Sequence, residues 1–206
     1  EVVSRRMKSY NSFIKEAKNE KVAVVTFGRL NPPSIGHSKL IDVMLGVAKR
    51  NSGTPMVFLS HTQNSKKDPL DYRTKVKICQ KAFGRDIIKN DTVNNPFDVV
   101  YKLRDEGYTH VYFIAGSDRV PQYTTMFKKY SGHPDKDKDI GVKLQVVSGG
   151  DRDPDADNAE GMSAGKMRTF AMENDYEHFV LASPDKLSVP DVKKLFIAVR
   201  KAMGAK

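Results

Sequence analysis

A glycine- and proline-rich loop directly follows the first strongly apolar run of the chain. It reads FGRLNPPSIGH from Phe27 to His37, and a helical pattern begins where it ends. Glycine allows a backbone to approach a ligand closely, and a helix N-terminus offers unpaired N–H groups that suit phosphate. The loop therefore supplies candidate phosphate-binding residues, which are Gly28, Arg29, Leu30, Asn31, Ser34, Gly36 and His37.

The spacing of the glycines in this loop excludes two common phosphate loops. It is neither the G-x-G-x-x-G of dinucleotide-binding folds nor the G-x-x-x-x-G-K-[ST] of the P-loop. His37 stands at the start of the expected helix. From there its ring can donate a hydrogen bond to a phosphate oxygen as negative charge develops on it.

A second segment with the same character, MSAGKMR, occupies residues 162–168. Ser163 is a good N-cap for a helix, so the N–H groups that follow it offer a second anion site. Lys166 and Arg168 lie in the first turns of that helix and can bring positive charge to a triphosphate. We therefore expect this segment to share a ligand with the first loop.

Two further groups of residues stand at the ends of apolar runs. Gly116 and Asp118 follow the fourth run, where a carboxylate can accept a hydrogen bond from a ribose hydroxyl. Lys66, Lys67 and Arg73 follow the second run and can clamp an acceptor phosphate or a triphosphate. The alternative for these three residues is a solvated loop and helix start.

Three of these segments, in this order, resemble the motifs of the HIGH-type nucleotidyltransferase superfamily. GRLNPPSIGH is similar to G-R-F-x-P-x-H-x-G-H, IAGSD to the G-x-D segment that ends the fourth strand, and MSAGKMR to ISSTxxR. The nearest likeness is to the archaeal-type nicotinamide-mononucleotide adenylyltransferases. The stretch from Ser60 to Arg73 resembles small bacteriophage-encoded members of the superfamily. Two positions depart from the pattern: Ser34 stands where the family has a phosphate-contacting His or Thr, and Gly165 where it has Thr.

The resemblance implies that the chain transfers a nucleoside monophosphate, AMP from ATP, to a small phosphorylated acceptor. The implied acceptor is nicotinamide mononucleotide, the products are NAD and pyrophosphate, and Mg²⁺ is carried by the nucleotide, with no metal ligand assigned to the protein. His37, Arg168, Ser34 and Arg29 would be the catalytic residues. A cytidylyltransferase, a pantetheine-phosphate adenylyltransferase or another acceptor stays open. Aromatic side chains able to stack on a pyridine ring are Tyr72, Phe97, Tyr101 and Tyr123.

The elements that must position these residues alternate along the chain. Apolar, β-branched runs occupy 22–27, 55–61, 86–89, 110–115 and 144–148. Continuous hydrophobicity of this kind is typical of parallel strands buried on both faces. Between and after them come helical patterns over 40–48, 72–83, from 96, 163–174, 176–182 and from 189. The order predicts an α/β fold, a doubly wound five-stranded parallel sheet with C-terminal helices.

We expect three segments within one domain. Residues 1–20 form a basic helical segment with Phe13, Ile14 and Ala17 on one face, residues 21–162 the nucleotidyltransferase α/β domain, and residues 163–206 the C-terminal helices that complete it. The acidic loop at 151–161 does not have the spacing of a calcium-binding EF-hand. Ala156 and Met162 stand where that loop requires Gly and Glu, which predicts an exposed loop.

Composition narrows the choice of partners. The 206 residues carry a net charge of +10 and have a mean hydropathy of -0.53, which favours a soluble protein with acidic partners such as phosphate-bearing molecules. The basic residues are spread along the chain without interleaved aromatic residues, so nucleic acid is not the expected partner. No apolar run is long enough to span a membrane and no signal-peptide pattern opens the sequence, which predicts a cytoplasmic protein, in the host cytoplasm if viral.

A function of another class remains as the alternative. In it the chain is a catalytically weakened module that binds nucleotides or nucleic acid. Ser34 and Gly165 would then be the damaged positions, and the net charge of +10 would serve binding. The sequence does not indicate an oligomeric state. The lone Cys79 fits a core position and a reducing compartment.

Overall fold

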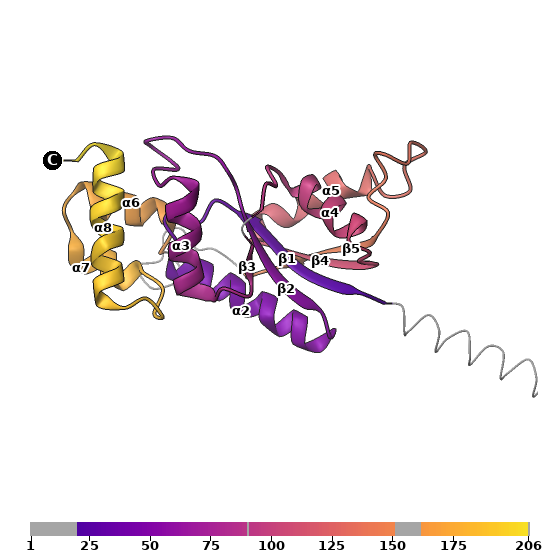
Figure 1. The fold of residues 1–206 in the computed structure, drawn as a ribbon, viewed down its shortest axis with the longest axis horizontal. Coiled ribbons are helices and arrows are strands. Elements are labelled where there is room, and N and C mark those ends of the chain that lie inside the picture. The colour runs from indigo at the N-terminus through magenta and orange to yellow at the C-terminus, as the bar shows by residue number, and fades with distance from the viewer. Residues whose placement is uncertain (1–19, 90, 151–161, 206) are drawn as a thin grey trace, which may run out of the picture.

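The computed structural model describes residues 20–89, 91–150 and 162–205. The predicted basic helix within 1–20 and the acidic loop at 151–161 therefore lie outside the described residues, Glu20 excepted. The elements, labelled in Figure 1, are β1 (Val22–Gly28), α2 (Ile35–Arg50), β2 (Thr54–Leu59), α3 (Tyr72–Phe83), β3 (Ile88–Lys89), α4 (Pro96–Asp105), β4 (His110–Ala115), the 3₁₀ turn η1 (Ser117–Arg119), α5 (Val120–Lys128), β5 (Lys143–Ser148), α6 (Ala164–Met172), α7 (Tyr176–Ala182) and α8 (Val189–Met203).

The five strands form one parallel sheet in the order β3-β2-β1-β4-β5. The chain moves outward from β1 through β2 and β3, and then returns to the other side of β1 for β4 and β5. The strand order thus reverses between β1 and β4, which is where open α/β sheets bind ligands. The predicted fold class, a doubly wound five-stranded parallel sheet with C-terminal helices, is confirmed.

Alternate residues of the strands enter two hydrophobic clusters, one on each face of the sheet. Val24 and Ile114 belong to the cluster that includes residues of α2 and α3, whereas Val25 and Phe113 belong to the cluster that includes residues of α4 and α5. Figure 1 shows the sheet between these helices. Cys79 is fully buried on the α3 side, and this burial raises the pKa of its thiol, so the side chain packs as a small apolar group.

The helix starts follow from side-chain caps. The Asp71 carboxylate accepts a hydrogen bond from the Thr74 N–H at the start of α3, and the Asn95 side chain accepts from two N–H groups of α4. Both helices begin where the sequence pattern predicts them, at residues 72 and 96. The strand predicted at 86–89 is shorter in the structure, where β3 consists of Ile88 and Lys89. It lies at the edge of the sheet and pairs with β2 through only these two residues.

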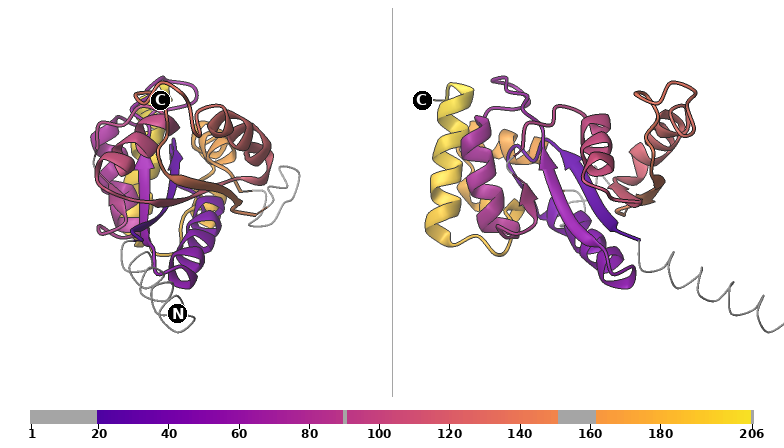
Figure 2. Two further views of the ribbon diagram at one scale, coloured as in Figure 1. Left: turned by 90° about the vertical axis from the view of Figure 1, so that its right-hand side faces the viewer. Right: turned by 45° about the vertical axis from the view of Figure 1, so that its right-hand side comes forward.

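The C-terminal helices α6, α7 and α8 lie beside α3, beyond the carboxyl ends of β1 and β2 (Figures 1 and 2). Their buried side chains join the cluster of α2 and α3, and those of α8 are Val192, Leu195, Phe196 and Val199. This docking brings the start of α6 to the edge of the sheet. The division of the chain at residues 162 and 163 stays a prediction.

Among the described helices, none combines the length and the apolarity that crossing a membrane requires.

Candidate functional site

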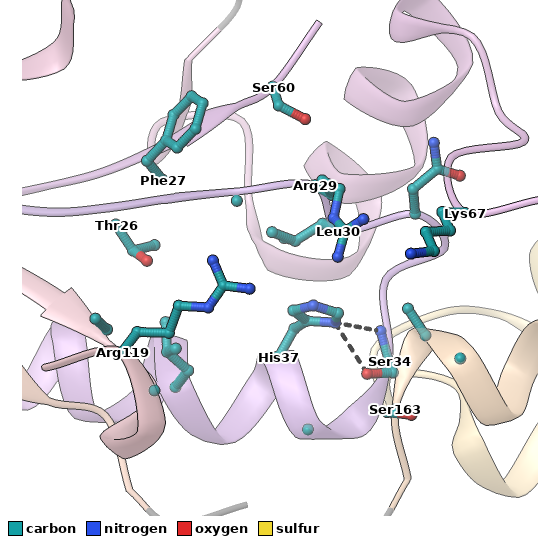
Figure 3. A pocket seen from close by; sticks show the side chains of 18 of the residues that line it. Thr26, Phe27, Arg29, Leu30, Ser34, His37, Ser60, Lys67, Arg119 and Ser163 are labelled. Carbon is teal, nitrogen blue, oxygen red and sulfur yellow. Dashed lines mark hydrogen bonds between the residues drawn. The ribbon is translucent and has the colours of Figure 1, made fainter. Parts of the chain in front are cut away.

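A cavity of about 470 Å³ opens at the carboxyl edge of the sheet, at the reversal between β1 and β4 (Figure 3). Most of the predicted site residues line it together: Gly28, Arg29, Leu30, Asn31, Ser34, Gly36, His37, Lys67, Gly116, Asp118, Ser163 and Arg168. Lys66, Arg73 and Lys166 are not among the lining residues. The two segments richest in candidate residues, far apart in the sequence, therefore face one space.

Two helices begin at this cavity. Ser34 precedes α2 and Ser163 precedes α6, and both serines have the extended backbone of an N-cap residue. The hydroxyl of Ser163 accepts a hydrogen bond from the N–H of Lys166 at 3.3 Å, so the predicted cap is confirmed. Each helix directs the positive end of its dipole toward the cavity, which suits a ligand with several phosphate groups.

His37 projects from the first turn of α2 into the cavity, and its ring contacts Ser34 (Figure 3). The main-chain N–H of Ser34 donates to Nδ1 of His37 at 3.1 Å, and the Ser34 hydroxyl lies 2.9 Å from the same atom. Ser34 is only 1% exposed. Its hydroxyl, expected to contact phosphate, is thus engaged with the histidine.

The glycine at position 36 is explained by a contact within the protein. A Cβ atom at Gly36 would lie 2.8 Å from the main-chain oxygen of Met162, which is closer than real Cβ atoms come to such an oxygen. The absence of a side chain therefore lets the start of α2 touch the segment before α6. Close approach to a ligand, which the sequence suggested as the reason for this glycine, is not needed to account for it.

Gly36→Ala is expected to lower the free energy of unfolding by about 1–3 kcal/mol, because the added methyl group must push α2 and Met162 apart. Gly46→Ala, in the same helix, is the matched control. Its Cβ atom would meet only the flexible end of Arg50 at 3.4 Å, so helix propensity should leave stability unchanged or raise it by up to about 1 kcal/mol. Urea unfolding of both variants measures the difference, and equal losses in the two would contradict the contact.

A chain of hydrogen bonds joins three segments of the chain at the cavity. The Arg168 guanidinium donates to the main-chain oxygen of Asn31 at 2.8 Å. The Asn31 side chain in turn donates to the oxygen of Leu70 and accepts from its N–H, both at 3.0 Å. Asn31 and Leu70 are both buried, so the two bonds between them are shielded from water. The arrangement fixes the first loop against both α6 and the segment before α3.

Positive side chains surround the cavity. Arg29 and Lys67 enter it from one side and Arg119 from the other, with His37 between them (Figure 3). Burial, and then the positive charge of Arg29, lower the pKa of the Arg168 guanidinium, which stays charged at neutral pH. Because these like charges repel one another, an anionic ligand placed among them would be stabilised.

The segment after β2 carries Lys67 to the cavity through its own hydrogen bonds. The Asn64 side chain accepts from the N–H of Lys67 at 2.7 Å, and the main chains of Asn64 and Asp68 form a bridge. The buried Asp68 accepts from the Thr62 hydroxyl at 3.0 Å and lies 3.9 Å from Nε of Arg29. This buried carboxylate therefore helps to hold Arg29 at the cavity.

Lys75 of α3 is a buried cation that the sequence did not single out. Its Nζ donates to the main-chain oxygen of Ser60, and the side chain is fully buried. Burial lowers the pKa of this amine, and the charge of Asp68 opposes that shift. Lys75 lies four residues before Cys79, on the buried side of α3, and this spacing could have indicated that it is buried.

Several lining residues lie outside the predicted set, and the sequence offers a signal for some of them. Arg119 follows Asp118 directly, and Tyr123 is the one of the four suggested aromatic residues that lines the described cavity. Thr26 and Phe27 lie near the carboxyl end of β1, which the parallel sheet places at the cavity. Asn94 follows β3, and no motif marks it.

No protein-family model matches the chain, and no curated protein sequence matches it. One of the solved structures that match is Thermotoga maritima TmcAL bound with alpha-thio ATP, at a TM-score of 0.47 and 11% sequence identity. The match covers 89% of this chain and 56% of that one, so this chain spans little more than half of that protein's length. This is a similarity of fold, and nothing in the assignment of the site depends on it.

Proposed function

We propose that the chain is a nucleotidyltransferase that transfers AMP from ATP to nicotinamide mononucleotide, giving NAD and pyrophosphate. The observation that carries the proposal is the meeting of Ser34 to His37 with Ser163 to Arg168 in one cavity at the strand reversal. Both segments begin helices there, and a helix N-terminus favours the negative charge of a phosphate group. We place this reaction in the cytoplasm.

The charges of the cavity support a ligand with several phosphate groups. Arg168, Arg29, Lys67 and Arg119 line it, and the carboxylate among its described lining residues is that of Asp118, 61% exposed. A triphosphate held at the two helix starts, together with a second phosphate near Lys67 and Arg29, would neutralise this excess. The positive charges of Lys67 and Arg29 therefore support an acceptor that carries a phosphate group.

In the proposed reaction a phosphate oxygen of the acceptor attacks the α-phosphorus of ATP. A new P–O bond forms there while the bond from the α-phosphorus to the bridging oxygen breaks, and pyrophosphate leaves with that electron pair. The protein's contribution is to align the two phosphates and to stabilise the charge that moves onto the leaving group. His37 can donate to a phosphate oxygen, and Arg168 can hold the pyrophosphate.

Mg²⁺ enters the proposal as an ion carried by the nucleotide. Mg²⁺ binds chiefly through substrate phosphates and water with one or two carboxylates, and Asp118 at the cavity could supply one of these. When bound, the ion would neutralise phosphate charge.

The test is to incubate the chain with ATP, CTP, GTP or UTP, Mg²⁺ and nicotinamide mononucleotide, and to measure pyrophosphate. Release with ATP, and NAD detected by mass spectrometry, is the expected result. If pyrophosphate is released with CTP alone, the nucleotide donor in the proposal is CTP and not ATP. If it is released only with another phosphorylated acceptor, the acceptor is not nicotinamide mononucleotide. No release with any nucleotide and acceptor, together with salt-sensitive binding to DNA or RNA, would overturn the proposal in favour of a binding module.

A further inference from the structure

Ser34 lines the cavity, but its hydrogen-bonding groups are engaged with His37 and are not turned toward a ligand. It is 1% exposed, and both of its hydrogen-bonding donors face His37. A phosphate-binding hydroxyl would need to face the ligand. The side chain that reaches the middle of the cavity from this turn is that of His37 (Figure 3).

The direction of one hydrogen bond determines the protons on the histidine ring. The main-chain N–H of Ser34 can only donate, so Nδ1 of His37, 3.1 Å away, must accept and carries no proton. The hydroxyl of Ser34, 2.9 Å from the same Nδ1, must then donate as well. A neutral imidazole with an accepting Nδ1 has its proton on Nε2.

We propose that Ser34 is a positioning residue, whose N–H and hydroxyl together hold His37 in the tautomer and orientation that make Nε2 a hydrogen-bond donor at the cavity. The inference rests on the proposed function and deepens it. Two donors on Nδ1 also fix the ring about its χ torsions, because turning the ring would leave both of them buried without a partner. A donor fixed before the ligand arrives needs no reorganisation during the reaction.

This role accounts for the serine at residue 34, where the chain departs from the nucleotidyltransferase pattern that it resembles. A hydroxyl three residues before the histidine belongs to the N-cap position, where serine is among the preferred residues. The residue that caps α2 thereby also fixes the orientation of the His37 ring. With serine at position 34, the phosphate contact of the pattern's His or Thr is absent, but the orientation of His37 is still fixed.

The first test is spectroscopic and needs no substrate. In protein labelled with ¹⁵N in histidine, the Nδ1 and Nε2 chemical shifts of His37, assigned by their loss in His37→Asn, should report the proton on Nε2 at pH 8. A proton on Nδ1 would overturn the proposal. Because activity plays no part in this measurement, its outcome stands apart from that of the proposed function.

The second test is kinetic. Ser34→Ala removes the hydroxyl and is expected to lower kcat by about tenfold while KM for ATP stays unchanged, since the ligand contacts remain. Ser34→Thr keeps the hydroxyl and should retain most of the turnover. An unchanged kcat in Ser34→Ala, or a rise in KM for ATP in place of a fall in kcat, would count against positioning. Circular dichroism and thermal unfolding check that both variants are folded.

Discussion

Replacing His37 with alanine should lower kcat by about a hundred- to a thousand-fold. The ring reaches the cavity from the start of α2. In the proposed reaction, its Nε2 would donate to a phosphate oxygen as charge develops in the transition state. Losing one such donor in other enzymes costs an amount of this order. The measurement is pyrophosphate release under saturating ATP and acceptor.

Two further variants separate the two ring nitrogens. The side-chain oxygen of Asn can replace the Nδ1 acceptor, so His37→Asn should keep the bond from Ser34 and the stability of α2, yet lose turnover as alanine does. The amide of Gln reaches further and can replace the Nε2 donor, so His37→Gln should retain part of the activity. His178→Ala, at an exposed position of α7, is the control and should turn over substrate as wild type does. Undiminished turnover in His37→Asn would show that the reaction does not use the Nε2 donor of His37.

The second large effect is expected at Arg168. Arg168→Ala should lower kcat/KM by about a hundred- to a thousand-fold, because it removes a cation from the cavity and releases the loop at Asn31. The lost bond leaves a buried carbonyl oxygen unsatisfied, so the free energy of unfolding should fall by about 1–3 kcal/mol. Kinetics and urea unfolding of the same preparation measure the two consequences.

Arg168→Lys tests geometry separately from charge. An ammonium group keeps the positive charge but cannot contact Asn31 and a phosphate in one plane as a guanidinium can, so only a small part of the activity should return. Arg85→Ala removes a positive charge from an exposed position on the chain and should leave kcat/KM unchanged. A comparable loss in Arg85→Ala would mean that net charge, and not position, controls activity.

The sequence was sufficient to predict the sheet and most of the cavity for one physical reason. The carboxyl ends of parallel strands meet at one edge, so residues that follow β1 and β4 converge whatever their separation in sequence. Gly28 and Asp118 could therefore be assigned to one site. Continuous apolar runs marked the strands because both faces of this sheet are covered by helices.

Contacts between side chains could not be predicted in this way. The hydroxyl of Ser34 could face a phosphate or His37, and only the torsions at the start of α2 decide between them. Lys75 was not singled out, because a charged residue in a helix is usually exposed, although its place on the stripe of Cys79 indicated burial. The bonds of Asn31 to Leu70 depend on how two irregular segments meet, for which no periodicity exists.

The bond between Arg168 and Asn31 spans 137 residues of sequence, and this distance has a consequence for biosynthesis. At about 5–20 residues per second, a ribosome adds the second half of the site on the order of ten seconds after the first. Until then the loop before α2 has no guanidinium to fix it, and closing so long a stretch of chain costs entropy. A nucleotide that bridges both halves can therefore bind only after the second half has been made and folded, and its binding then stabilises the completed fold.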